Sequence, residues 1–257
     1  MDAKTFASKL RVADLTKKRY VENIAHFLRW LNGRKPSPET AQEYIDYLEK
    51  QGKKPGTVAI AANSLRAYFK VQSLKLEINA PKITIGEPKY LTLDQVKTLL
   101  EHCQTPLQRC LVTVLFDTGL RAMELLELKV KDIDFERGFL HVTRKGGREA
   151  DVLISEKGLA ALKEYLNWRR SRTPSPRVFM DWKYQDVYYV LKKLGRRAGI
   201  PDFTPHKLRH SLAVYMLDHG AELYAVQQIL GHTSISTTAN IYSRHRPAHL
   251  AKFRIPW

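Results

Sequence analysis

Hydrophobic residues in the first eighty positions recur with the spacing of amphipathic helices. The clearest stripe consists of Val21, Ile24, Phe27, Leu28 and Leu31. Ser37-Pro38-Glu39 is typical of a helix start with proline in the first turn, and Gly52 fits the end of that helix. Another stripe predicts a third helix from about Thr57. The pattern therefore predicts a helical domain over residues 1–80.

The helical pattern stops at residues 81–90. This stretch contains two prolines and a glycine and carries no apolar stripe, which is typical of a linker between domains. Thr92-Leu93-Asp94-Gln95 follows as a capping box, in which the Thr and Gln side chains satisfy backbone amides of the first helical turn. A second domain is therefore predicted over residues 91–257.

The second domain has one clear strand pattern within otherwise helical sequence. Residues 139–145 and 148–154 flank Gly146-Gly147, a pair expected in a tight hairpin turn. Helical stripes precede this hairpin over residues 96–103, 107–118 and 121–128. The predicted fold class is mainly α with a small β-hairpin or sheet.

The net charge of the chain indicates what kind of partner it binds. The chain has 43 Lys and Arg against 26 Asp and Glu, a formal charge of +17 and a pI near 9.8. Such an excess attracts polyanions, and double-stranded DNA presents a charge roughly every 1.7 Å along its axis. Since no basic tail accounts for the excess, we expect a DNA partner; the alternative is a protein that is merely basic.

Cysteine usage and hydropathy indicate the compartment. Cys103 and Cys110 are the only cysteines, and they form neither a disulfide framework nor a CxxC metal pair. We expect both thiols to be buried in the core and the compartment to be reducing. No apolar run has the length of a membrane span, and the N-terminus lacks the pattern of a signal peptide. We expect a cytoplasmic protein without a membrane partner.

Two basic side chains mark a candidate phosphate site near a predicted helix start. Thr204 fits the N-cap position and Pro205 the first turn, which places His206 and Arg209 on one face at the positive end of the helix. The alternative is a solvated surface pair. His210 lies four residues after His206, but a zinc site is disfavoured because no acidic residue or third ligand accompanies the two histidines.

Further candidates lie near the end of the chain. Gly231 fits a helix stop and places His232 in a turn. Tyr242 follows ten residues later, after a polar run. Taken alone, this tyrosine would be read as an ordinary half-buried core residue, so the case for chemistry depends on the combination of motifs.

The combination resembles the tyrosine recombinase/integrase family, and its Xer-like branch in particular. The matching motifs stand in the family's order, and the resemblance extends over essentially the whole chain. They are Thr118-Gly119-Leu120-Arg121-Ala122-Met123-Glu124-Leu125, Thr143-Arg144-Lys145-Gly146-Gly147, His206-Lys207-Leu208-Arg209-His210-Ser211-Leu212-Ala213, and Leu230-Gly231-His232-Thr233-Ser234-Ile235-Ser236-Thr237-Thr238 before Ile241-Tyr242. The resemblance implies a core-binding domain in residues 1–80 and an α+β catalytic domain in residues 91–257.

The resemblance also implies how phosphate would be held. Arg121 and Arg209 would clamp the scissile phosphate, since a guanidinium matches phosphate bidentately and stabilises charge that grows in the transition state. Lys145 would protonate the leaving 5′ oxygen. Glu124, one turn after Arg121, either positions that arginine or forms a plain ion pair with it.

The same resemblance assigns the covalent step. Tyr242 would attack phosphorus and form a 3′-phosphotyrosyl link, His206 would assist as a general acid or base, and His232 would hydrogen-bond the phosphate. A phenol with a pKa of about 10 needs such neighbours to react at neutral pH. Because the cations replace the Mg²⁺ of other phosphoryl-transfer sites, we expect no metal, cofactor or ATP requirement.

The family further implies a homo-oligomer on DNA, with four protomers joining two sites. The Xer-like motifs suggest resolution of chromosome or plasmid dimers. A mobile-element integrase, a type IB-like topoisomerase and a non-catalytic DNA-binding regulator remain alternatives. Residues 243–257 form a shorter C-terminal segment than the family commonly uses to dock neighbouring protomers, and they are either a docking motif or a loose end.

Overall fold

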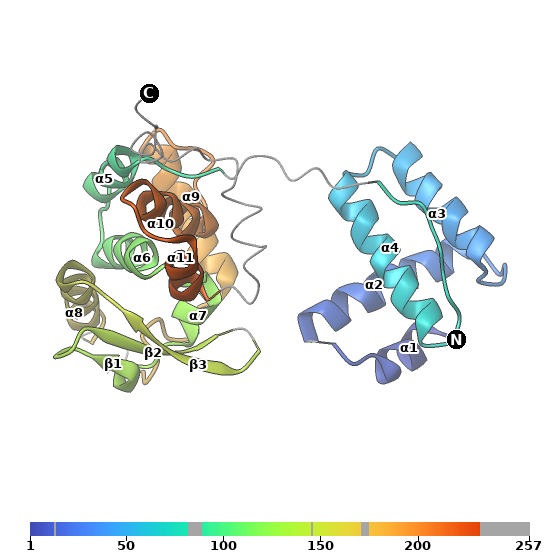
Figure 1. Ribbon diagram of the computed structural model, residues 1–257, viewed down its shortest axis with the longest axis horizontal. Coiled ribbons are helices and arrows are strands. Elements are labelled where there is room, and N and C mark those ends of the chain that lie inside the picture. Colours follow the sequence, from blue (N-terminus) through green and yellow to red (C-terminus); the bar gives the residue numbers. More distant parts are fainter. Residues whose placement is uncertain (13, 82–88, 145, 171–174, 232–257) are drawn as a thin grey trace, which may run out of the picture. The chain divides into compact units, whose positions relative to one another are not determined.

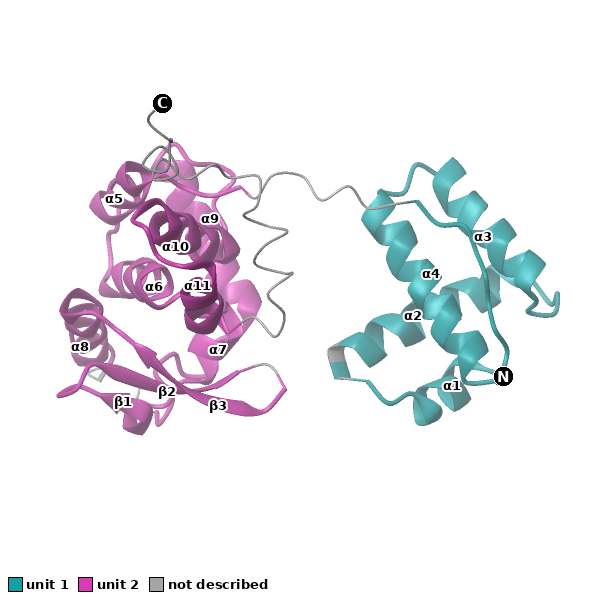
Figure 2. Cartoon of the chain, in the orientation of Figure 1, with its two compact units in different colours: residues 1–86 teal, residues 87–257 magenta. Residues whose placement is uncertain are grey.

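The computed structural model describes residues 1–12, 14–81, 89–144, 146–170 and 175–231 (Figure 1). The chain forms two compact units, Met1–Gly86 and Glu87–Trp257 (Figure 2). Each unit has a hydrophobic core of its own. We therefore describe them one at a time.

Helices make up the regular structure described in the first unit. They are α1 (Ala3–Lys9), α2 (Asp14–Leu31), α3 (Pro38–Lys50) and α4 (Pro55–Lys70). α2 contacts each of the other three, and the stripe residues Ile24, Phe27 and Leu31 are buried in the core between them. α4 begins two residues before the predicted Thr57, because Pro55 occupies its first turn.

The predicted limits of α3 are confirmed at both ends. The Ser37 side chain accepts a hydrogen bond from the amide of Thr40, and the Thr40 hydroxyl accepts one from the amide of Ser37. Gly52, just past the helix, has a φ of 68°, a left-handed conformation that glycine adopts without a steric penalty. Local sequence therefore fixes this helix.

In the second unit, α6 is the central helix. It packs against α5, α8, α9 and α10, and its buried face includes Cys110, Leu111, Val112, Val114 and Leu115. Cys110 is fully buried, as expected, whereas Cys103 is only partly buried. The helices of this unit are α5 (Leu93–Glu101), α6 (Pro106–Thr118), α7 (Ala122–Glu127), α8 (Glu156–Arg170), α9 (Tyr184–Arg197), α10 (Pro205–Asp218) and α11 (Leu223–Leu230).

A small antiparallel sheet lies beside α7 and has the strand order β1-β2-β3. The strands are β1 (Ile133–Asp134), β2 (Phe139–Arg144) and β3 (Arg148–Leu153). The predicted hairpin is present, but its loop is longer than the predicted two-residue turn: Arg144 pairs with Arg148, which leaves three residues between the strands. β1 was not predicted, since two residues are too few to show a periodic pattern.

Alternate residues of β2 face the core. Leu140, Val142 and Arg144 are buried, whereas His141 and Thr143 are exposed. An arginine therefore occupies an inward position directly after two apolar residues.

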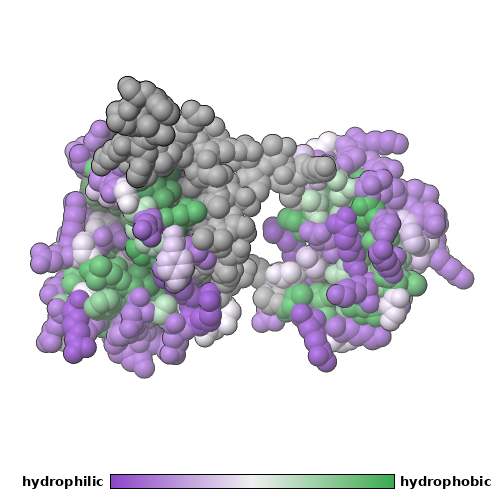
Figure 3. All heavy atoms as spheres, viewed as in Figure 1, coloured by the Kyte–Doolittle hydropathy of each residue, from purple (hydrophilic) through white to green (hydrophobic). Residues whose placement is uncertain are grey.

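The surface is mostly polar. Figure 3 shows hydrophilic side chains over much of the visible face of each unit, interrupted by apolar patches. None of the described helices combines the length and apolarity needed to span a membrane.

Candidate active site

Arg209 of α10 joins two other motifs of the second unit. Its side chain is 4% exposed and donates hydrogen bonds to the carbonyl oxygens of Gly119 and Leu230. Gly119 precedes Arg121 by two residues, and Leu230 directly precedes Gly231 at the end of α11. One buried guanidinium therefore brings together three segments that are far apart in the sequence.

Arg121 stands at the N-cap of α7, immediately after the turn that ends α6. Gly119 forms that turn with a φ of 62°, and the amide of Leu120 donates to the Thr118 hydroxyl. Glu124 is 5% exposed and holds Arg121 twice, through the guanidinium at 2.7 Å and the backbone amide at 2.9 Å. The two readings of Glu124 therefore describe one contact: an ion pair that also orients the arginine.

His206 lies on α10 one turn before Arg209, as predicted. Thr204 occupies the N-cap position and Pro205 the first turn, although the Thr204 side chain makes no capping hydrogen bond. Partial desolvation of the ring lowers the pKa of His206, and the charges of Arg209 and Arg121 lower it further. The imidazole is therefore neutral at physiological pH, with both guanidinium groups within electrostatic reach.

His210 is the second imidazole of this helix. Burial lowers its pKa to about 4, and His206 and Arg209 add to the effect. Among the described residues, no group of three or more His, Cys, Asp or Glu side chains could hold a metal ion. The charges that act on the histidine pair are thus cationic, from Arg209 and Arg121.

Lysines surround an open cavity of about 410 Å³ next to His206. Lys89 lies 3.7 Å from Asp202, and Lys192 donates to the carbonyl of Pro201 at 2.8 Å. Desolvation lowers the pKa of Lys207, with Asp202 opposing the shift and the other two lysines adding to it. Three ammonium groups facing one carboxylate leave a positive surface suited to anions.

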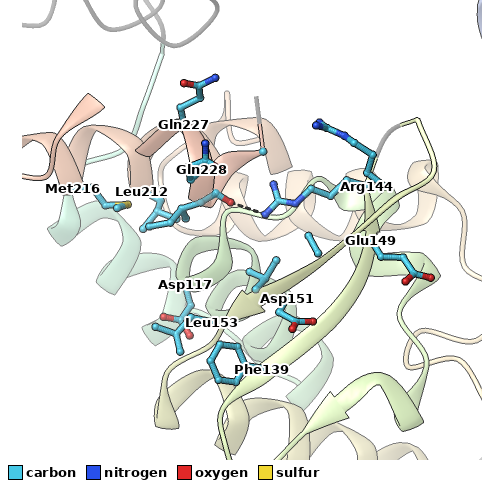
Figure 4. A pocket seen from close by; sticks show the side chains of 15 residues that line it. Asp117, Phe139, Arg144, Glu149, Asp151, Leu153, Leu212, Met216, Gln227 and Gln228 are labelled. Carbon is cyan, nitrogen blue, oxygen red and sulfur yellow. Dashed lines mark hydrogen bonds between the residues drawn. The ribbon is translucent and has the colours of Figure 1, made fainter. Parts of the chain in front are cut away.

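Arg144 is a site residue that sequence reasoning missed. It is 7% exposed, and its Nη2 donates to the carbonyl oxygen of Ile229 at 2.8 Å (Figure 4). It lines a cavity of about 680 Å³ between β3 and the helices α10 and α11. The alternation of β2 carried the signal, because Arg144 is in phase with the inward-facing Leu140 and Val142.

Three predicted residues lie outside the described part of the chain: Lys145, His232 and Tyr242. Lys145 and His232 directly adjoin described residues, whereas Tyr242 lies eleven residues beyond Gly231. Lys145 follows Arg144, and His232 follows Gly231. The described site thus comprises Arg121, His206 and Arg209, with the segments that lead to two of the remaining positions.

Sequence comparison relates the chain to known proteins. The pattern of the phage integrase family matches residues 89–249. The tyrosine recombinase XerA of Pyrococcus furiosus is 36% identical over 262 residues, covering 95% of this chain and 90% of the relative. The matched family region contains all of the motifs described above.

Solved structures share the fold. The crystal structure of a XerA recombinase superposes with a TM-score of 0.60 at 27% identity, covering 99% of both chains. The XerH site-specific recombinase bound to its difH substrate, in a pre-cleavage complex, gives a TM-score of 0.73 at 21% identity, covering 93% of this chain and 79% of that one.

Proposed function

This chain belongs to the phage integrase family, and from that premise we propose that it is a site-specific DNA recombinase. It cleaves and rejoins strands through a 3′-phosphotyrosyl intermediate. The observation that carries the proposal is the Arg209 guanidinium, because its two backbone contacts gather Arg121, His206 and the α11 terminus at one point. A phosphodiester is the substrate that such a set of cations and a neutral imidazole fits.

Arg121 and Arg209 bind the non-bridging oxygens of the scissile phosphate. Both guanidinium groups are held before substrate arrives, Arg121 by Glu124 and Arg209 by two carbonyls. Groups fixed in advance stabilise the negative charge of the transition state without the cost of reorienting.

The covalent step exchanges one ester for another. The Tyr242 phenol oxygen attacks phosphorus, neutral His206 accepts the phenol proton, and the bond from phosphorus to the 5′ oxygen breaks. Lys145 gives a proton to that leaving oxygen, and His232 hydrogen-bonds the phosphate. The reverse attack by a 5′ hydroxyl restores DNA, so the ester energy is conserved and neither ATP nor a metal ion is consumed.

Duplex DNA is the partner of both units. The lysines around the cavity beside His206 bind neighbouring backbone phosphates. Residues 1–80 act as the core-binding domain and residues 81–90 link them to the catalytic domain; the division of the chain into the units Met1–Gly86 and Glu87–Trp257 supports this assignment. Four protomers on two sites carry out strand exchange. The related XerH was solved bound to its difH substrate, in agreement with such a DNA partner.

The Xer-like role is the finer part of the proposal. Similarity to a XerA recombinase over 95% of the chain supports resolution of chromosome or plasmid dimers over integration of a mobile element or relaxation of supercoils. In a cell without a nucleus, chromosome and plasmid DNA lies in the cytoplasm. We therefore assign the protein to the cytoplasm.

The central test is covalent capture on DNA. Wild-type protein is incubated in EDTA with nicked duplexes of randomised sequence, and adducts that resist denaturation are isolated and their DNA is sequenced. We expect a recurrent site linked through its 3′ phosphate. Tyr242→Phe should form no adduct yet bind the selected duplex with affinity close to that of the wild type.

A second tyrosine variant serves as the control. Tyr224→Phe changes an exposed tyrosine of α11 and should leave adduct formation unchanged. An adduct that persists in Tyr242→Phe would overturn the nucleophile assignment. Complete dependence on added Mg²⁺ would contradict the metal-independent mechanism.

A further inference from the structure

Arg144 connects the end of β2 to the end of α11. Its Nη2 donates to the Ile229 carbonyl, one of the last carbonyls of the helix, across 85 residues of sequence. Figure 4 shows the side chain reaching from the strand to that carbonyl. Its Nη1 is buried, and among the described residues no hydrogen-bond partner accompanies it.

Gly231 leaves room for this guanidinium because it has no side chain. A Cβ atom at position 231 would lie 1.7 Å from Arg144 Nη1 and 2.5 Å from Cζ, so no other residue type fits without moving the arginine. The φ of Gly231 is also 61°, which already favours glycine. Glycine is therefore required at the end of α11 for two reasons: the left-handed backbone conformation and the lack of space for a Cβ atom. Only the backbone conformation could be predicted from the sequence.

An arginine at this position is costly. Within the described chain, no carboxylate lies within ion-pair distance of Arg144. Burial lowers its pKa, while the carboxylate of Glu124 opposes that shift. Removing an unpaired guanidinium from water is unfavourable, and the partial negative charge at the C-terminal end of α11 offsets only part of that cost.

An apolar residue would meet the needs of the core better. Leu140 and Val142 occupy the two preceding inward positions of β2, and a third aliphatic side chain there would avoid the desolvation cost. What the arginine adds is a directional bond between two backbone points. Both points lie close in sequence to predicted site residues. Lys145 directly follows Arg144, and His232 lies two residues after Leu230.

We propose that Arg144 is a positioning residue that fixes the β2 terminus against the α11 terminus and so sets Lys145 for protonation of the leaving oxygen. This rests on the proposed recombinase function. In this role Arg144 acts not by contacting the phosphate but through the two backbone segments that it joins, the end of β2 and the end of α11. Displacing it affects the step that needs a proton on the 5′ oxygen more than it affects phosphate binding.

The test compares two leaving groups. The nicked site captured by wild-type protein is prepared once with the natural 5′ oxygen at the scissile phosphate and once with a bridging sulfur, which leaves as a thiolate without needing a proton. Arg144→Met should slow adduct formation on the oxygen site about a hundredfold, the lower range for loss of a general acid. On the sulfur site it should react within about threefold of wild type.

Matched variants separate positioning from charge and folding. Arg148→Met removes an exposed arginine from the facing hairpin position and should show the same small change on both sites. Arg144→Lys keeps the charge without the forked geometry, and we expect it to be rescued by sulfur like Arg144→Met. It also keeps the test valid if Arg144→Met fails to fold, which thermal unfolding would reveal.

Gly231→Ala supplies independent evidence. Because its Cβ would displace the guanidinium, we expect the same oxygen-specific defect, and the double variant Arg144→Met/Gly231→Ala should be no slower than the slower single variant. Equal slowing of Arg144→Met on both sites, or no slowing at all, would overturn the proposal. Failure of wild-type protein to form any adduct would instead refute the recombinase function itself.

Discussion

At the scale of the residue, surroundings decide which side chains of this site carry charge. The guanidinium groups of Arg121 and Arg209 are held by fixed partners. Desolvation instead lowers the pKa of both histidines of α10, with Arg209 adding to the effect at both and Arg121 at His206. The proposed phosphate site thus also contains a neutral imidazole, since a protonated imidazole beside two guanidinium groups would be unfavourable.

This neutrality predicts how stability depends on pH. His210 has a folded pKa of about 4 against an ordinary 6.5, so below pH 6.5 the unfolded chain takes up a proton that the folded state resists. The free energy of unfolding should therefore fall as the pH drops from about 6.5 to about 4, by at most roughly 3 kcal/mol for this group. Urea unfolding of His210→Asn at several pH values should show a shallower fall.

The exposed His219 at the end of α10 offers a matched control. His219→Asn should follow the wild-type pH profile. If His210→Asn lost stability with acid as steeply as wild type, the burial of His210 would not be the cause of the acid sensitivity. His206 contributes in the same direction, so some acid sensitivity should remain in the His210 variant.

At the scale of the element, helix ends position the functional groups. α6 ends at Gly119, α7 begins after Arg121, and α11 ends at Gly231. Glycine stops are readable from sequence because they reflect local backbone geometry. The space around each glycine is not readable, and it differs greatly from one to the next: Gly119 faces two leucines, whereas Gly146 faces open space.

This contrast predicts unequal costs for one substitution. A Cβ at Gly119 would lie 2.7 Å from Leu230 Cδ2 and 2.9 Å from Leu212 Cδ2. Gly119→Ala should lower the free energy of unfolding by about 2–5 kcal/mol, from left-handed strain plus overpacking. Gly146→Ala, with strain alone, should cost about 1–2 kcal/mol. Denaturant unfolding measures both, and equal losses would show that the leucine contacts are unimportant.

At the scale of the whole molecule, charge and domain organisation determine how the protein meets DNA. The excess of positive charge was evident from composition, but its focus beside His206 is a property of the folded second unit. Lys89, Lys192 and Lys207 come from three separate segments. Their position beside His206 makes them part of the proposed DNA surface.

Salt dependence of binding tests this surface. Affinity for the captured duplex, measured by fluorescence anisotropy at several salt concentrations, should fall steeply as salt rises. Replacing Lys192 or Lys207 by Gln should lower the magnitude of the salt slope by about 1 each. Lys163 of α8 packs over the Phe135 ring, and Lys163→Gln should leave the slope unchanged. Slopes unchanged by both the Lys192 and the Lys207 replacement would contradict a phosphate role for the cluster.

The sequence by itself determined what depends on near neighbours. Capping at Ser37 and Thr92, the proline starts, the glycine stops and the alternation of β2 all follow from contacts within a few residues. The order of the motifs was enough to indicate the family. These signals need no knowledge of where distant segments lie.

Only the tertiary structure decided how the motifs meet. Arg209 binds a carbonyl 90 residues away, and Arg144 one that is 85 residues away. No periodicity encodes such partners, because the backbone carbonyls they bind exist in every residue and carry no sequence signal. Local sequence thus indicates the chemistry. Packing around α6 and the contacts of the buried arginines determine which groups lie together.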